Sequence, residues 1–175
     1  KYFESNIDKY LKNFNSEYKI TGESSPNYSK YHLFDNVPER IYNSLGQGVK
    51  FIYILRDPVK RIISHYYEAQ SQNRIEGSLD NFLKGNLEKN NIILTSLYYE
   101  QLSKFLEFYP INQIKIITFE RLKENRIDTM NDIYNFLNLT PINDTKAYDY
   151  IFNSSNNKRS KNILYKLVYN SFLFK

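Results

Sequence analysis

Residues 49–64, with the sequence VKFIYILRDPVKRIIS, join a short apolar run to a helix start signal, and this junction constrains the fold more than any other part of the chain. The run over residues 49–55 is β-branched and aromatic, which is typical of a parallel strand covered on both faces. Asp57 can then cap a helix whose first position is Pro58. The junction therefore predicts a buried strand that passes directly into a helix.

Three positively charged side chains and one hydroxyl lie close to this junction in the sequence. Arg56 ends the strand, and Lys60, Arg61 and Ser64 fall near the edge of the following helix. The i, i+3, i+4, i+7 spacing places Val59, Ile62, Ile63 and Tyr66 on the face that we expect to pack on the sheet. A phosphate at this point would gain free N–H groups, the positive end of the helix dipole, a guanidinium fork and a hydroxyl. Taken singly, Arg56 could instead pair with a carboxylate such as Asp57, and Ser64 could be a solvated hydroxyl.

The rest of the chain predicts alternating helices and strands. Helical spacing and start signals indicate helices over about 7–14, 38–46, 78–83, 95–109, 128–137 and 164–172, and apolar runs indicate strands at 19–22 and 114–119. Strands alternating with helices imply an α/β layer fold with a mainly parallel sheet. With 175 residues, of which 41% are hydrophobic, the chain is expected to form a single domain.

Composition excludes several kinds of site. The chain has no cysteine, which rules out disulfides, zinc thiolate sites and thiol nucleophiles. His32 and His65 lie far apart without ligand spacing, so no metal site is expected. No apolar stretch reaches the ~20 residues that span a bilayer. The net charge of +5 favours anionic ligands, although the lysines alternate with acids along most helices, as on an ordinary solvated surface.

Three ordered segments resemble one family, the sulfotransferases that use 3′-phosphoadenosine 5′-phosphosulfate (PAPS), in their bacterial and heparan-sulfate-type branch. The run LRDPVKRIISHY is similar to the 3′-phosphate-binding motif of that family, in which an arginine ends the strand and a serine follows eight residues later, as Arg56 and Ser64 do here. Residues 22–28, GESSPNY, resemble the family's Gly-Glu-Lys-Ser/Thr-Pro-x-Tyr segment. Residues 97–139 resemble its C-terminal half.

The resemblance implies a three-layer fold like that of P-loop NTPases, PAPS as donor, 3′,5′-ADP as product, and no metal. The implied binding residues for the nucleotide are Arg56, Ser64, Lys158 and Arg159, and those for the acceptor or the transferring group are Glu23, Ser24 and Tyr28. In much of this branch the catalytic base is a glutamate in a region that would precede Lys1. No catalytic residue is therefore assigned within the chain.

Two departures from the family pattern bear on catalysis. The phosphosulfate loop of the family has no counterpart, and if residues 1–3 match the Lys-Glu-x-x-Phe-Phe segment, the chain begins just downstream of that loop. We therefore expect residues 1–175 to form one sulfotransferase-like domain without its N-terminal phosphosulfate-binding strand, loop and helix. Ser24 stands where many relatives carry lysine, and a serine supplies no positive charge to the transferring sulfonate.

The expected function is transfer of a sulfonate from PAPS to a hydroxyl or amine of a carbohydrate or glycolipid. Two alternatives stay open: a non-catalytic basic module that binds polyanions, and a degenerate relative that binds the nucleotide without turnover. We expect no nucleic-acid partner and no membrane span. The resemblance implies a cytoplasmic location for a bacterial protein and the Golgi lumen for a eukaryotic one.

Overall fold

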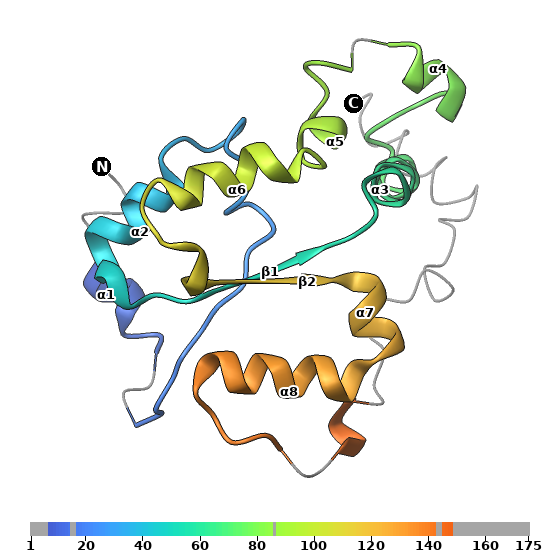
Figure 1. Ribbon diagram of the computed structural model, residues 1–175. Helices are drawn as coiled ribbons and strands as arrows, with labels where there is room; N and C mark the ends of the chain where they lie inside the picture. Colours follow the sequence, from blue (N-terminus) through green and yellow to red (C-terminus); the bar gives the residue numbers. More distant parts are fainter. Residues whose placement is uncertain (1–6, 15–16, 86, 143–144, 149–175) are drawn as a thin grey trace, which may run out of the picture. The chain divides into compact units, whose positions relative to one another are not determined.

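The computed structural model describes residues 7–14, 17–85, 87–142 and 145–148 (Figure 1). Strands β1 (Phe51–Leu55) and β2 (Ile114–Thr118) are neighbours in a sheet and run parallel (Figure 1). Helices precede and follow each strand along the chain, so the predicted α/β class with a parallel sheet is confirmed. The chain divides into two compact units, one made of residues 1–55 and 88–116 and the other of residues 56–87 and 117–175.

The first unit holds β1 and a group of packed aromatic rings. Its helices are α1 (Ile7–Leu11), α2 (Val37–Leu45), α5 (Asn91–Leu94) and α6 (Tyr98–Leu106), with short 3₁₀ turns η2 (Gly46–Gly48) and η3 (Ile111–Gln113). The Phe51 ring lies 5.1 Å from the ring of Phe105 and 4.7 Å from that of Tyr109, centroid to centroid. These edge-to-face contacts hold α6 and the segment after it against β1.

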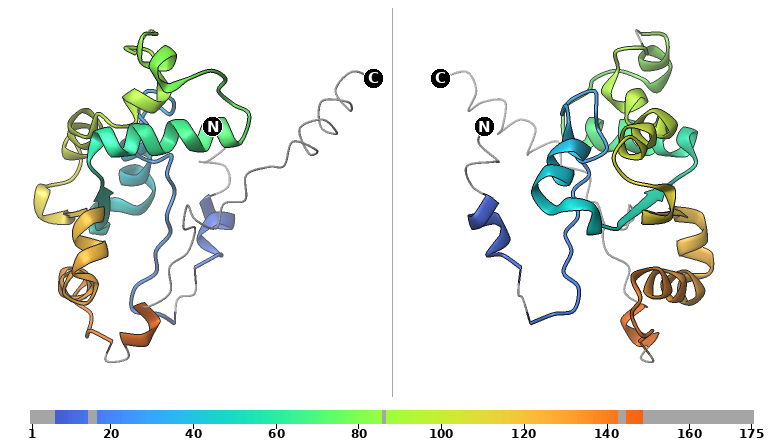
Figure 2. Two further views of the ribbon diagram at one scale, coloured as in Figure 1. Left: turned by 90° about the vertical axis from the view of Figure 1, so that its right-hand side faces the viewer. Right: turned by 60° about the vertical axis from the view of Figure 1, so that its left-hand side comes forward.

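The second unit is built around α3 (Pro58–Ser71), which the left view of Figure 2 shows side-on as one straight helix. Its other helices are α4 (Leu79–Leu83), α7 (Phe119–Glu124), α8 (Arg126–Leu137) and the 3₁₀ turn η4 (Thr145–Tyr148). Tyr66 is completely buried, its ring lies 5.1 Å from that of Phe82, and its hydroxyl donates to the carbonyl of Gly77 at 2.8 Å. Tyr66 therefore ties α3 to the loop before α4 and to α4 itself.

Helix starts follow the sequence signals closely. Asp57 caps α3 by accepting from the backbone N–H of Lys60 at 2.8 Å, and Pro58 takes the first helical position, as predicted. Ser78 caps α4 in the same way by accepting from Asn81 at 3.2 Å. Helix α2 ends before Gly46, whose φ of 73° lies in the left-handed region that glycine adopts without strain.

Several details differ from the sequence predictions. Residues 19–22 are not a strand, because no neighbouring strand pairs with them in the described part of the chain. Strand β1 is not covered on both faces, since Ile52 and Ile54 are exposed. The predicted helix at 95–109 is confined to α6, the helices α5 and α7 were not predicted, and α8 begins two residues before Asp128.

The inward face of α3 was also only partly predicted. Tyr66 is buried as expected, but Val59 is 62% exposed and Ile63 is also exposed, whereas Ala69 is buried. The apolar spacing identified the helix correctly. The buried residues of α3 are Tyr66 and Ala69, and spacing alone does not encode the contacts of Tyr66 with Gly77 and Phe82.

Candidate anion-binding site

Arg56 lies at the end of β1 and immediately before the cap of α3. Its side chain is half-buried, and its guanidinium carbon lies 5.4 Å from the centre of the Phe119 ring, within the range of a cation–π contact. Phe119 is the first residue of α7, directly after β2. The ends of both strands thus contribute to the position of this cation.

The N-terminus of α3 offers fewer free donors than the sequence suggested. Pro58 has no N–H, the N–H of Lys60 binds the Asp57 side chain, and the N–H of Arg61 binds the Asp57 carbonyl at 2.9 Å. Of the first four residues of α3, only Val59 keeps an N–H that no hydrogen bond uses in the described part of the chain. A phosphate at this junction would therefore depend on side chains more than on the helix N-terminus.

An acidic side chain also reaches this junction. The Glu120 carboxylate accepts from the backbone N–H of Asp57 at a donor–acceptor distance of 3.4 Å, which is long for a hydrogen bond. The junction of β1 and α3 therefore holds charges of both signs. The cations are Arg56, Lys60 and Arg61, and the carboxylates are those of Asp57 and Glu120. Sequence reasoning did not include Glu120, because it lies far from the junction along the chain.

Ser64 lies on the second turn of α3 and is exposed. It follows Lys60 by four residues, so the two side chains share one side of the helix. Arg56 and Ser64 belong to the same compact unit and are separated by two helical turns at the start of α3. Arg56 thus precedes α3 and Ser64 lies within it, and their assignment to one phosphate site stays a prediction.

The three residues predicted to face the acceptor lie in the other unit and have different surroundings. The pKa of Tyr10 is raised by burial and by a hydrogen bond to Glu23, so the Glu23 carboxylate is already in contact with a tyrosine hydroxyl. Ser24 is exposed on the loop. Tyr28 lines a small hollow beside α6 together with residues that the sequence did not single out. The predicted basic pair, Lys158 and Arg159, lies outside the described residues.

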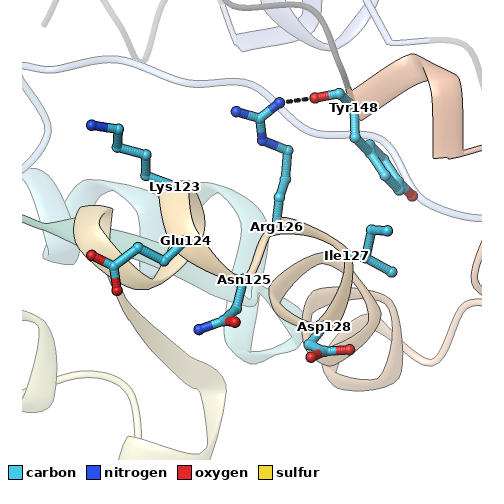
Figure 3. Close-up of a pocket in the computed structure, with 7 residues that line it drawn as sticks. All are labelled: Lys123, Glu124, Asn125, Arg126, Ile127, Asp128 and Tyr148. Carbon is cyan, nitrogen blue, oxygen red and sulfur yellow. Dashed lines mark hydrogen bonds between the residues drawn. The ribbon is translucent and has the colours of Figure 1, made fainter.

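A second hollow of about 320 Å³ lies where α7 passes into α8 (Figure 3). It is lined by Lys123, Glu124, Asn125, Arg126, Ile127, Asp128 and Tyr148. The Arg126 guanidinium donates to the backbone carbonyl of Tyr148, as the dashed line in Figure 3 shows. The negative charges of Glu124 and Asp128 balance the positive charges of Lys123 and Arg126. The hollow therefore has no net positive charge to attract a phosphate.

Two classes of feature are absent from the described part of the chain. No group of three or more histidine, cysteine, aspartate or glutamate side chains could hold a metal ion there. Within those same residues, none of the helices has the length and apolar character needed to cross a bilayer.

Comparison with known proteins decides the family. The sequence profile of the sulfotransferase domain matches residues 7–170, which is nearly the whole chain. The chain belongs to the sulfotransferase family. The predicted resemblance is therefore confirmed, and the junction of β1 and α3 described above lies within the matched sulfotransferase domain.

The relatives of this sulfotransferase domain include enzymes named for heparan sulfate. The mouse protein heparan sulfate glucosamine 3-O-sulfotransferase 5 is 29% identical over 164 residues, which cover 87% of this chain and 46% of that protein. The Drosophila melanogaster bifunctional heparan sulfate N-deacetylase/N-sulfotransferase is 29% identical over 119 residues, 62% of this chain and 11% of that protein. The chain thus spans less than half the length of these relatives.

A solved structure shares the fold. The crystal structure of a sulfotransferase from Alicyclobacillus acidocaldarius superposes with a TM-score of 0.66 at 20% identity, covering 94% of this chain and 65% of the other. At this level of identity the likeness supports the P-loop-like α/β fold alone.

Proposed function

We propose that this protein transfers a sulfonate group from PAPS to a hydroxyl or amine of a carbohydrate, with a saccharide of the heparan-sulfate type as the first candidate acceptor and a glycolipid as the second. The observation that carries the proposal is Arg56, a half-buried cation held against Phe119 where β1 meets a capped helix. Membership of the sulfotransferase family supports the reaction class. The relatives named for heparan sulfate support the acceptor class.

In this proposal Arg56 and Ser64 bind the 3′-phosphate of the donor. Arginine suits this task because its planar fork pairs with two phosphate oxygens and stays charged at any physiological pH. The contact with Phe119 orients the guanidinium before the ligand arrives, which lowers the entropy lost on binding. A hydrogen bond to a charged group of this kind contributes ~1.5–3 kcal/mol.

The proposed reaction is an in-line displacement at sulfur. A bond forms between the acceptor oxygen or nitrogen and the sulfur, while the bond from sulfur to the bridging phosphate oxygen breaks. That bond's electron pair leaves with 3′,5′-ADP, and the acceptor proton passes to a base. Positioning of the donor and fixed positive charge supply most of the rate enhancement for such a transfer.

Transfer of radiolabelled sulfonate from PAPS to desulfated heparan oligosaccharides tests this function. We expect labelled saccharide to form, and we expect Arg56→Ala to weaken the affinity for 3′,5′-ADP by ~10- to 100-fold because the charged hydrogen bonding of the guanidinium to the 3′-phosphate is lost. An exposed cation in the same unit, Lys84, offers the matched control Lys84→Ala, which should leave that affinity unchanged. Absence of both transfer and 3′,5′-ADP binding would contradict the proposal.

A degenerate sulfotransferase that binds nucleotide without turnover is the second candidate. Two observations favour it: the Glu120 carboxylate at the Asp57 N–H, and serine rather than lysine at position 24. This candidate predicts selective binding of 3′,5′-ADP together with no transfer to any saccharide. The polyanion-binding alternative predicts steep salt dependence and equal binding of 3′,5′-ADP and 5′-AMP.

A further inference from the structure

The small hollow beside α6 that Tyr28 lines measures about 150 Å³, lies within the first unit, and combines apolar and acidic side chains. It lies between the loop before α2 and one side of α6. Its floor is buried and includes Val37 and Gln101, while Tyr28, Phe34 and Asp35 at its rim are exposed. Ligand pockets for drug-sized molecules usually measure ~300–1,000 Å³, so this hollow suits a single small ring.

The floor of the hollow is fixed by hydrogen bonds. The Gln101 side chain accepts from the Tyr53 hydroxyl at 2.7 Å and donates to the Leu94 carbonyl at 2.8 Å. Gln101 is almost fully buried, so both bonds are shielded from water. The floor is therefore preformed, and binding a ligand requires little reordering.

The rim presents the side chains that sugars commonly meet in binding sites. Tyr28 and Phe34 are exposed aromatic residues that can pack on the C–H face of a sugar ring, and Tyr28 adds a hydroxyl. Asp35 and Asn36 provide a carboxylate and an amide that can bind adjacent hydroxyls. Apolar rings beside a few convergent polar groups are the usual composition of a small-ligand site.

The charges around the hollow select among sugars. Lys104 and Glu107 form an ion pair at 2.7 Å and largely neutralise each other. Asp35 has no ion-pair partner in the described part of the chain, so the uncompensated charge at the rim is negative. A sugar that carries a carboxylate or a sulfate would be repelled here, whereas a protonated amine would be attracted.

We propose that this hollow binds one pyranose unit that carries neither carboxylate nor sulfate, and binds it most tightly when the unit bears a protonated amine. The inference rests on the proposed function to the extent that this unit is assigned to the acceptor saccharide. It adds to that function a preference for unsulfated, amine-bearing positions at this subsite. Binding at the hollow itself needs no nucleotide and can be measured without it.

The test compares three trisaccharides that differ only at the nitrogen of one residue, which is glucosamine, N-acetylglucosamine or N-sulfoglucosamine. Calorimetry and saturation-transfer NMR would measure their binding to the purified protein in the absence of nucleotide. We expect the amine form to bind most tightly and the N-sulfo form least tightly. Asp35→Asn should weaken the amine form about two- to fivefold and the N-acetyl form less, because only the amine carries a charge. Tyr28→Leu should weaken both by about fivefold through loss of the ring contact.

Two variants in the same unit serve as matched controls. Tyr99→Leu removes an aromatic ring that is 83% exposed on α6 and does not line the hollow, and Glu88→Gln removes an exposed carboxylate elsewhere. Neither should change the affinity for any of the trisaccharides. The inference is overturned if Asp35→Asn and Tyr28→Leu weaken binding no more than these controls do, or if the N-sulfo form binds as tightly as the amine form.

A thermal-shift measurement with 3′,5′-ADP on the same proteins separates this inference from the proposed function. If 3′,5′-ADP binds and sulfonate is transferred while the trisaccharides show no binding that depends on Asp35 and Tyr28, the subsite is wrong and the function stands. If the trisaccharides bind as expected but 3′,5′-ADP does not, the subsite stands and the sulfotransferase activity is wrong.

Discussion

Arg56 and Glu120 bring opposite charges to the start of α3, and a phosphate ligand would interact with both. The guanidinium attracts the phosphate, whereas the carboxylate competes for the Asp57 N–H and repels the same ligand. Affinity for the nucleotide should therefore depend on both residues in opposite directions.

The substitution Glu120→Gln tests the role of this carboxylate. We expect it to tighten 3′,5′-ADP binding by about two- to fivefold, because it removes one negative charge near the phosphate and keeps the shape of the side chain. Calorimetry on the variant and on Glu124→Gln, an exposed acid on the same helix, measures the effect. Equal affinity in both variants would show that Glu120 does not face the bound phosphate.

Tyr109 makes the free energy of unfolding depend on pH in the alkaline range. Burial, with a smaller contribution from Tyr42, raises the pKa of Tyr109 to about 12, and its hydroxyl donates to the Gly46 carbonyl at 3.3 Å. Above pH ~10 the unfolded chain loses this proton while the folded chain retains it, so the free energy of unfolding falls as pH rises toward about 12. The slope from one such group is at most about 1.4 kcal/mol per pH unit.

Urea unfolding of wild type and Tyr109→Phe between pH 9 and 12 measures this contribution, with the pH range chosen to bracket the shift. The variant should lose less stability than wild type over that interval. Tyr99→Phe, at an exposed tyrosine, should follow wild type. Parallel pH profiles for all three proteins would refute the role of Tyr109.

Among the features of the helices, the N-terminal caps are those that the sequence predicted best. An Asx or Ser cap acts through hydrogen bonds within three residues, so Asp57 and Ser78 could be identified without any knowledge of tertiary contacts. The buried face of α3 and the partners of β1 depend on residues far along the chain. Spacing therefore predicted the helix and the strand but not the exposure of Val59 or Ile54.

The same reasoning explains the candidate sites. Arg56 and Ser64 were identified because both flank one local junction. Glu120 reaches that junction, and Asp35 joins Gln101 at the hollow, only through the folded chain. Residues that meet only in the folded chain have no fixed spacing in the sequence. No sequence pattern could therefore have identified Glu120 or Asp35 as part of a site.

The cap of α3 gives a prediction on stability. Asp57→Ala should lower the free energy of unfolding by about 1 kcal/mol, within a usual range of ~0.5–2, because the Lys60 N–H loses its partner. Asp57→Asn keeps an acceptor oxygen and should cost much less. Chemical denaturation of both variants measures the difference, and equal losses would mean that the cap does not contribute.

For the molecule as a whole, the described structure places the apolar side chains of the sheet in unequal environments. Ile117 on β2 is 2% exposed, whereas Ile54 on β1 is 49% exposed. Truncation of a buried isoleucine to alanine costs ~2–5 kcal/mol, because the cavity adds to the lost transfer free energy. Ile117→Ala should therefore destabilise the protein by that amount, and Ile54→Ala by about 1 kcal/mol or less.

Denaturant unfolding of these two variants tests the exposure of the β1 face. A loss for Ile54→Ala as large as that for Ile117→Ala would show that another part of the protein covers this face. A clear difference between the two would confirm that one face of the sheet is open to water.

The proposed activity requires the protein to bind a nucleotide with a 3′-phosphate more tightly than one without it. Isothermal titration with 3′,5′-ADP and with 5′-AMP, on wild type and Arg56→Ala at fixed ionic strength, measures this distinction. We expect wild type to bind 3′,5′-ADP at least ~10-fold more tightly than 5′-AMP, and Arg56→Ala to lose most of that preference. Equal affinities for the two nucleotides in wild type, or a preference that survives in Arg56→Ala, would contradict the assignment of Arg56 to the 3′-phosphate.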